Sequence, residues 1–341
     1  MKKFFGRGLT ILLLVAITLI GCSKQTGGGK SSGNDKKDKM NLKVSITVSE
    51  QDTWGVAAKK WAQDVEEKTN GHIKMKIYAN ESLSNGNQPK GLEALQNGST
   101  DISVHSTIIY SVLDEKFATP SLPWLIPNYE QADKAMNGEG GQKLMEIIRE
   151  NGIEPLAFGE SGYRQITNSK HPIVTPEDIK GLKIRTPSME MMVDTFKKFG
   201  GDPTVMNWSE VFTSLQQGVI DGQENPLPII LNSKLSEVQD YLTVWNYMYD
   251  PIVFGMNKKL FDGLDEETQK IIKETAQEAA KYQIELNRKQ NEEILAELKE
   301  KGMEVVELTP EQIEVFQKEV QPVIDQYEKI VGKDLLDAFK N

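Results

Sequence analysis

Two arginine residues stand in sequence contexts that suit the binding of an anion. Arg185 ends an apolar strand directly before Thr186 and Pro187, and strand ends in α/β sheets point toward the ligand crevice. Arg164 lies in the stretch 162–166, where a first lobe is expected to pass into a second. A guanidinium presents a planar fork that can hold a carboxylate with two hydrogen bonds. Either arginine could instead pair with a structural Asp or Glu, and composition alone favours that alternative.

Two further side chains could line a cleft beside these arginines. Asn225 precedes Pro226 in a polar run that predicts a turn. Its amide could bind a carboxylate or a hydroxyl, although a turn-forming role is the more common one. Trp208 could cover a ligand as an aromatic wall, or it could pack at a helix N-terminus.

A short motif occurs twice in the chain. Leu-Gln-x-Gly-x-x-Asp stands at 95–101 and again at 215–221. The position four residues after the aspartate is His105 in the first copy and Asn225 in the second. We therefore expect two α/β lobes of related design, with His105 and Ser106 facing an interlobe cleft opposite Asn225. Clefts between lobes are common small-molecule sites.

The sequence lacks the motifs of common catalytic and cofactor sites. It has no P-loop, no Gly-x-Gly-x-x-Gly after a strand, no His-Glu-x-x-His and no Gly-x-Ser-x-Gly. Its three histidines have no supporting motif, and its one cysteine excludes a multi-cysteine metal site. The net charge of -10 argues against a nucleic-acid partner. We expect binding without a cofactor or a metal. The alternative is an extracytoplasmic enzyme acting on acidic sugars, with His105 or Glu210 as its base.

The N-terminal segment predicts export and a membrane tether. Three basic residues precede an apolar run at 9–20 that is too short for a lasting membrane span. The run ends in Leu-Ile-Gly-Cys, which resembles a bacterial lipobox, so we expect a signal peptide at 1–21 and lipid modification of Cys22. Residues 22–41 are rich in Gly, Ser and Lys and predict a flexible linker. The folded part would lie outside the cytoplasm, anchored to the cell membrane, and in the periplasm if an outer membrane is present. An ordinary secreted protein is the alternative.

Hydrophobic periodicity predicts the elements that would position these residues. The expected elements before the C-terminal third are strands at 42–48, 72–78, 101–104 and 181–185, and helices at 54–65 and 188–199. No Pro or Gly interrupts 265–301, which predicts one long helix, either continuous or broken near Asn287 or Asn291. Thr309 and Pro310 then start a last helix as its cap and first residue.

Several of these stretches together resemble one known family. The segments 162–164, 181–187 and 209–226, the last of which ends in Asp-Gly-Gln-Glu-Asn-Pro, are similar to motifs of the substrate-binding proteins of TRAP (tripartite ATP-independent periplasmic) transporters. The similar branch includes binders of C4-dicarboxylates, sialic acid and uronates. Matching pieces occur from about residue 42 to the end of the chain.

The resemblance implies a fold. It is an α/β, two-lobe periplasmic-binding-protein-like fold with a long helix spanning both lobes. Residues 42–161 plus 251–290 would form lobe I, and residues 162–250 plus 291–341 would form lobe II.

The resemblance also implies roles for the candidate residues. Arg185 would form a bidentate salt bridge with the ligand carboxylate, and Arg164 would add a second contact near the hinge. Asn225 would bind the ligand from lobe II, and Trp208 stands where the family often places an aromatic ring over the ligand. The residues expected to complete the pocket from lobe I are Gln51, Asp52, His105 and Ser106.

The implied function is capture of a small organic acid and its delivery to the membrane subunits of a TRAP transporter, by a monomer that closes about a hinge. Tryptophan and polar groups favour a sugar acid such as a uronate, with a C4-dicarboxylate or an oxo acid as alternatives. A lipoprotein that presents its ligand to a membrane sensor would share the same pocket. Many family members carry a His where this chain has 244–251, so we expect an altered aromatic lining there.

Overall fold

The computed structural model describes residues 39–340, in which strands and helices alternate along the chain as expected. The strands are β1 (Met40–Ile46), β2 (Ile73–Tyr78), β3 (Ile102–Ser106), β4 (Ile153–Asn168), β5 (Lys183–Thr186), β6 (Asp202–Val205), β7 (Gly222–Pro226), β8 (Tyr241–Val244), β9 (Tyr249–Asn257) and β10 (Glu304–Glu307). The helices are α1 (Thr53–Lys68), α2 (Gln88–Asn97), α3 (Thr107–Tyr110), α4 (Tyr129–Asn137), α5 (Glu139–Glu150), α6 (Glu190–Lys198), α7 (Trp208–Gln216), α8 (Leu227–Asn232), α9 (Lys258–Asp262), α10 (Glu266–Glu300), α11 (Pro310–Val331) and α12 (Lys333–Lys340).

The predicted signal peptide, Cys22 and most of the predicted linker lie outside the described residues. The predicted end of the linker at residue 41 is wrong by two residues, because Met40 and Asn41 already belong to β1 and pair with Ile73 and Lys74 of β2. Within the described part of the chain, no helix combines the length and the apolar character needed to cross a bilayer.

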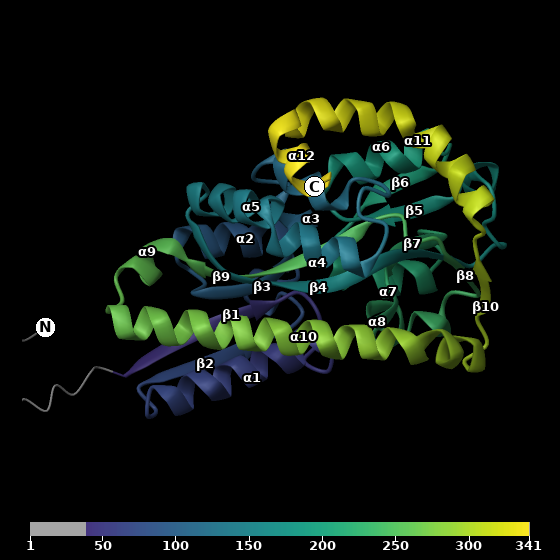
Figure 1. Ribbon diagram of the computed structural model, residues 1–341. Coiled ribbons are helices and arrows are strands. Elements are labelled where there is room, and N and C mark those ends of the chain that lie inside the picture. The colour runs from purple at the N-terminus through teal and green to yellow at the C-terminus, as the bar shows by residue number, and fades with distance from the viewer. Residues whose placement is uncertain (1–38, 341) are drawn as a thin grey trace, which may run out of the picture. The chain divides into compact units, whose positions relative to one another are not determined.

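The strands of residues 39–340 form one sheet whose two halves are each built on parallel strands. The path runs β2-β1-β3-β9-β4-β7-β5-β6, with β8 pairing with β4 and β10 with β8. In one half β1 is parallel to β2 and β3, and in the other β5 is parallel to β6 and β7. The antiparallel strands β9 and β4 join the two halves through the middle, as Figure 1 shows.

The two copies of the repeated motif fold alike. Each copy ends a helix, α2 or α7, and its glycine adopts a positive φ of 80° or 70°. In each copy the aspartate accepts a main-chain N–H from a strand of the same half-sheet. Asp101 accepts from Lys43 at 2.7 Å, and Asp221 accepts from Lys183 at 2.9 Å. The prediction that residues 95–101 and 215–221 are structurally equivalent is therefore confirmed.

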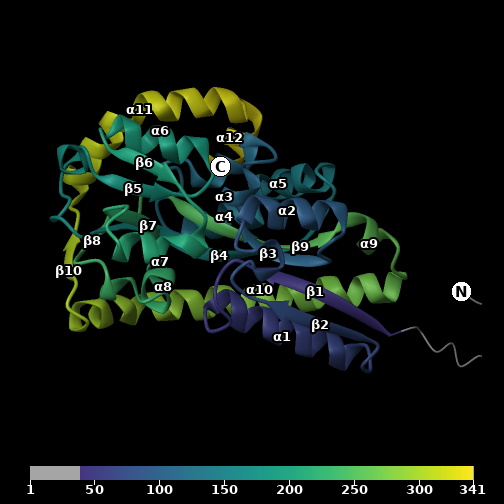
Figure 2. The same ribbon diagram turned by 180° about the vertical axis from the view of Figure 1, so that it is seen from behind.

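Helix α10 is continuous over its 35 residues, which confirms the predicted long helix and excludes the alternative of a break near Asn287 or Asn291. Both asparagines point instead toward the sheet side, where Asn287 donates to the main chain of Ser161 at 3.3 Å and Asn291 to Tyr129 Oη at 3.1 Å. Helix α10 packs with β4, α1, α8 and β10. Its first half shares a hydrophobic core with β1 and α1, and its second half shares another with α7, α8 and β8. Figures 1 and 2 show it running along both half-sheets, which confirms the expected spanning helix.

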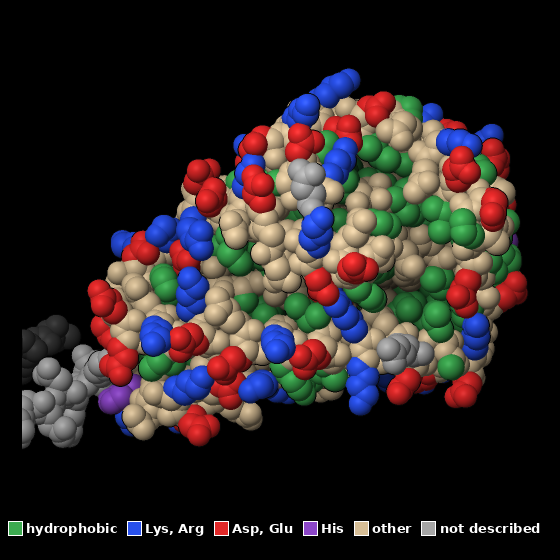
Figure 3. All heavy atoms as spheres, viewed as in Figure 1, with side chains coloured by type: hydrophobic (Ala, Val, Ile, Leu, Met, Phe, Trp, Pro, Cys, Tyr) green, Lys and Arg blue, Asp and Glu red, His purple; other side chains and the backbone are tan. Residues whose placement is uncertain are grey.

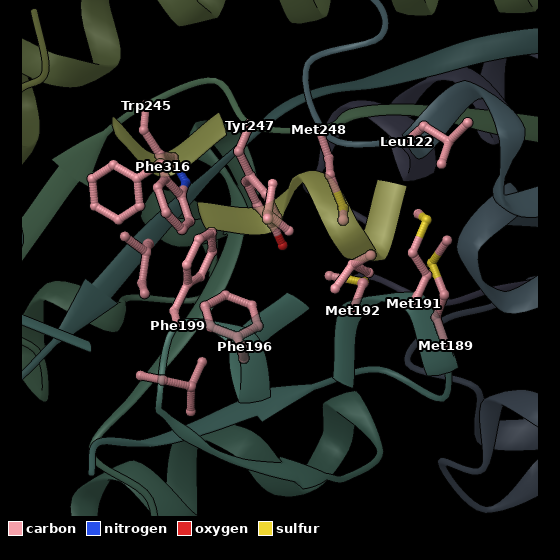
Figure 4. Packing of buried hydrophobic residues seen from close by; sticks show 14 of the residues in the cluster. Leu122, Met189, Met191, Met192, Phe196, Phe199, Trp245, Tyr247, Met248 and Phe316 are labelled. Carbon is pink, nitrogen blue, oxygen red and sulfur yellow. The ribbon is translucent and has the colours of Figure 1, made fainter. Parts of the chain in front are cut away.

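An aromatic and methionine core fills the space between α6, α11 and the segment before β9. Trp245 and Tyr247 are fully buried there against Phe196, Phe199 and Phe316, as Figure 4 shows. The Trp245 ring centroid lies 4.5 Å from that of Tyr247. The expected aromatic lining from this segment is wrong, because Trp245 and Tyr247 pack into the core, and of residues 244–251 only Asp250 lines the cavity described below.

The expected crossover near Gly162 coincides with an irregularity in β4. The pairing of β4 with β9 shifts register between Glu160 and Gly162, and Gly162 has a φ of 106°. The last helix, α12, packs against α5 through Leu335 and Phe339, so the end of the expected lobe II contacts lobe I. The boundaries of the two lobes stay a prediction.

Candidate functional site

A cavity opens where parallel strands of both half-sheets reach their carboxyl ends. These ends lie at Val48 after β1, Ser106 of β3, Arg185 of β5 and Asn225 of β7. Carboxyl ends of parallel strands are the usual place for a ligand in α/β folds. The space between the lining side chains, with the open solvent at its mouth, is about 380 Å³. The lining residues are Thr47, Val48, Trp54, Gln88, Ser106, Ile108, Ile109, Arg164, Arg185, Pro187, Trp208, Asn225, Ile229 and Asp250.

Arg185 is buried in this lining without an acidic partner. It is 2% exposed, and its Nε and Nη2 donate to the main-chain oxygen of Met206 at 2.9 and 2.7 Å. Its guanidinium lies 5.5 Å from the centroid of the Trp208 ring. Among the described residues, no carboxylate forms a salt bridge with it. Burial lowers the pKa of Arg185, and the attraction of the more distant Glu224 compensates only in part.

Arg164 lines the same cavity but is held by two structural carboxylates. Its Nη1 donates to Asp250 at 2.6 Å, its Nη2 to Glu224 at 2.8 Å, and its Nε also donates to Glu224. Burial alone would lower the pKa of Arg164, but the two carboxylates raise it above its ordinary value. The alternative that the sequence left open, an arginine paired with structural acids, therefore applies to Arg164.

Three other predicted residues also reach the cavity. Asn225 lies in β7 and not in the predicted turn, and its Nδ2 donates to Gln223 at 2.6 Å while its Oδ1 accepts from Arg164 at 3.0 Å. Ser106 ends β3, donates to Asp250 and caps α3. Trp208 begins α7 and is half-buried at the cavity wall. Five of the predicted ligand-binding residues are thus brought together.

The structure does not bring the remaining three predicted residues to this lining. His105 is fully buried one position before Ser106, where the alternation of β3 turns it to the other side and its Nε2 contacts Glu81. Asp52 is used as the N-cap of α1 and accepts from Asn232 at 3.0 Å. Gln51 is exposed to solvent.

Some lining residues carried no recognisable signal in the sequence. Gln88 is buried at the start of α2, and its Oε1 accepts from the main-chain N–H of Trp208 at 3.3 Å. Asp250 reaches the cavity from β9. Glu224, which orients Arg164, stands inside the Asp-Gly-Gln-Glu-Asn-Pro run, so that motif could have pointed to it. In residues 39–340, no three His, Cys, Asp or Glu side chains are grouped so as to hold a metal ion.

Comparison with known proteins identifies the family. Residues 44–330 match bacterial extracellular solute-binding protein, family 7. The chain is 33% identical to the 2,3-diketo-L-gulonate-binding periplasmic protein YiaO of Escherichia coli strain K12 over 267 residues, 78% of this chain and 81% of that protein. It is 30% identical to the C4-dicarboxylate-binding protein DctB of Bacillus subtilis strain 168 over 333 residues, 96% of this chain and 95% of that protein.

A solved structure has the same fold. The TRAP periplasmic solute-binding protein of Ralstonia eutropha H16 with bound (S)-2-acetolactate superposes with a TM-score of 0.86 at 34% identity, covering 88% of this chain and 97% of that one. The predicted α/β fold is confirmed by this likeness. The chain therefore belongs to bacterial extracellular solute-binding protein family 7, the family of the TRAP periplasmic solute-binding proteins, and it is an extracytoplasmic binder of organic acids and not an enzyme.

Proposed function

We propose that this protein captures a small organic acid by pairing the ligand carboxylate with Arg185, and that it delivers the acid to the membrane subunits of a TRAP transporter. The observation that carries the proposal is the buried Arg185 guanidinium, which has main-chain contacts but no carboxylate partner among the described residues. A buried charge without a partner is costly. A ligand carboxylate would supply the missing partner.

Binding and closure would be coupled through the cavity. Thr47, Gln88 and Ser106 approach the ligand space from the expected lobe I, while Arg185, Trp208 and Asn225 approach it from the expected lobe II. A ligand that contacts both sets favours the closed arrangement over the open one. Transport by the membrane subunits would then act on the closed, loaded form.

The ligand class is the finer part of the proposal. The named relatives bind a diketo sugar acid, a C4-dicarboxylate and acetolactate, so all three alternatives of the sequence prediction have a counterpart among them. The preference for a uronate over the other two ligand classes rests on Trp208 and the polar lining. It stays a prediction.

Isothermal titration calorimetry tests the role of Arg185. After a thermal-shift screen of organic acids has found a ligand, Arg185→Ala should weaken its binding by about 2–5 kcal/mol, because one partner of a desolvated charge pair is removed. Arg149→Ala, which removes an arginine paired with Glu154 away from the cavity, is the matched control and should bind as the wild type does. Unchanged affinity in Arg185→Ala would remove Arg185 from the site.

The proposed tether is lipid attached to Cys22. Cys22→Ser should move the protein from the membrane fraction to the soluble fraction and abolish incorporation of a labelled fatty acid. Membrane association that survives this substitution would exclude the lipid anchor without affecting the proposed ligand site.

A further inference from the structure

The charges around the cavity leave room for one carboxylate. Arg164 is balanced by two carboxylates, Glu224 and Asp250, so these three side chains together carry one negative charge. Arg185 carries the one positive charge that remains. A ligand carboxylate would pair with Arg185, but a second one would face Asp250 with no further cation in the lining. Like charges at short range in a buried site repel strongly.

The hydrogen-bonding capacity of the lining is mostly used within the protein. The Ser106 hydroxyl donates to Asp250, the Thr47 hydroxyl donates to Glu81 at 3.3 Å, and one Nδ2 hydrogen of Asn225 goes to Gln223. Hydrogens remain for a ligand on Arg185 Nη1, on Gln88 Nε2 and as the second Nδ2 hydrogen of Asn225. A ligand head rich in acceptor oxygens suits these donors.

The rest of the lining is apolar. It consists of Val48, Trp54, Ile108, Ile109, Pro187 and Ile229. Such walls favour a hydrocarbon body over a polyhydroxylated one, because burial of unpaired hydroxyls is unfavourable and burial of methyl groups is favourable.

A wall of three residues lies between this cavity and a second one. The second cavity, lined by Asn80, Glu81 and Phe212 among others, shares Thr47, Gln88 and Trp208 with the first. The hydrogen bond from the Trp208 main chain to Gln88 Oε1, 3.3 Å long, joins the two sides of this wall. The side chain of Gln88 therefore lies at the boundary between the Arg185 cavity and the larger second cavity.

On the basis of the proposed function, we propose that this site selects short monocarboxylates that carry an oxo or hydroxyl oxygen on the adjacent carbon and an apolar tail, and that Gln88 sets the limit on tail length. The carboxylate pairs with Arg185, and the adjacent oxygen accepts from Asn225 or Gln88. The tail packs on the isoleucine and proline walls. This assignment differs from the uronate that the sequence favoured.

Calorimetric titration of the full-length protein with matched acids tests the ligand class. The probes are 2-oxoisovalerate, 2-oxoglutarate, which has the same head and a second carboxylate, and galacturonate. We expect 2-oxoisovalerate to bind at least about tenfold more tightly than the other two, since the site leaves their extra polar groups unpaired. Equal or tighter binding of 2-oxoglutarate or galacturonate overturns the assignment. If that binding is still lost in Arg185→Ala, the proposed function stands and only the ligand class falls. If no organic acid binds at all, the proposed function fails with it.

Substitution of Gln88 tests the length limit. In Gln88→Ala, 2-oxooctanoate should gain about tenfold in affinity relative to 2-oxoisovalerate, because its tail can enter the second cavity. Gln217→Ala, at an exposed position just after α7, is the control and should leave the ratio unchanged. Gln88→Ser, with a similar small side chain, replaces Gln88→Ala if circular dichroism shows that the latter is unfolded. An unchanged ratio in a folded Gln88 variant overturns the role of Gln88.

Discussion

Arg185 directs both its Nε and its Nη2 to a single acceptor, the main-chain oxygen of Met206, at 2.9 and 2.7 Å. One edge of the guanidinium is thereby fixed to the backbone just before α7, while Nη1 makes no hydrogen bond with a described residue. The arrangement orients the side chain without neutralising its charge. This distinguishes Arg185 from Arg164, whose charge is balanced by direct salt bridges with Glu224 and Asp250.

The first prediction concerns the stability of the ligand-free protein. Arg185→Met should leave its free energy of unfolding within about 1 kcal/mol of the wild-type value, or raise it, because an apolar side chain of similar length replaces an unpaired buried charge. Urea denaturation followed by circular dichroism measures the change. A loss of more than about 3 kcal/mol would mean that Arg185 is a structural residue.

The second prediction is that the corresponding substitution of Arg164 destabilises the protein. Arg164→Met should lower the free energy of unfolding by about 3–5 kcal/mol, because it leaves the buried carboxylates of Glu224 and Asp250 without their cation. The same denaturation experiment measures it, with Arg185→Met as the matched comparison. Equal stability of the two variants would contradict the division of roles between the arginines.

The sequence could predict features that depend on local periodicity and caps. The strand that carries Arg185, the cap at Asp265 and the start of α11 at Thr309 all follow from side chains within a few residues of each other. The repeated motif is of the same kind, since its glycine and aspartate act within one helix-to-strand connection.

Long-range pairings could not be predicted in this way. Glu224 and Asp250 lie 60 and 86 residues from Arg164, and Gln88 lies 120 residues from Trp208. Nothing in the local pattern of either stretch specifies its partner. The error at His105 has a different cause. The repeated motif makes His105 equivalent to Asn225, but the alternation of β3 brings Ser106 to the cavity and turns His105 toward Glu81.

The third prediction concerns the pH dependence of stability at Glu81. Burial raises the pKa of Glu81, but His105 and the hydroxyls of Ser84 and Thr47 outweigh it, so the pKa lies below the ordinary 4.5. A carboxyl group whose pKa is lowered by folding stabilises the folded state at every pH above its ordinary pKa. This stabilisation is lost as the pH falls through the lowered pKa of the folded state. Glu81→Gln should therefore be less stable than the wild type at neutral pH, and the difference should shrink below pH 4.5.

Urea denaturation at a series of pH values measures this difference. Glu300→Gln, at an exposed position at the end of α10, is the control and should follow the wild-type profile. A difference between Glu81→Gln and the wild type that stays constant down to acid pH would contradict the role assigned to the ionised Glu81.

The fourth prediction concerns the contact between Gly86 and Ser209, two residues that line the second cavity beside the Arg185 site. Ser209 Oγ donates to the main-chain oxygen of Gly86 at 3.4 Å, and a Cβ added at Gly86 would lie 2.9 Å from Ser209 Cβ and closer still to its Oγ. Gly86 belongs to the expected lobe I and Ser209 to the expected lobe II. Gly86→Ala should therefore push the two segments apart and weaken ligand binding by about tenfold, since the closed form is needed for tight binding.

Backbone strain must be separated from this steric effect, because Gly86 has a φ of 80°. Gly71 provides the matched control, with a φ of 76° and no atom within 4 Å of an added Cβ. Both alanine variants should lose about 1 kcal/mol of unfolding free energy through the positive φ. Only Gly86→Ala should also lose ligand affinity in calorimetric titration. Equal affinities in the two variants would mean that contact between these two segments is not required for the bound state.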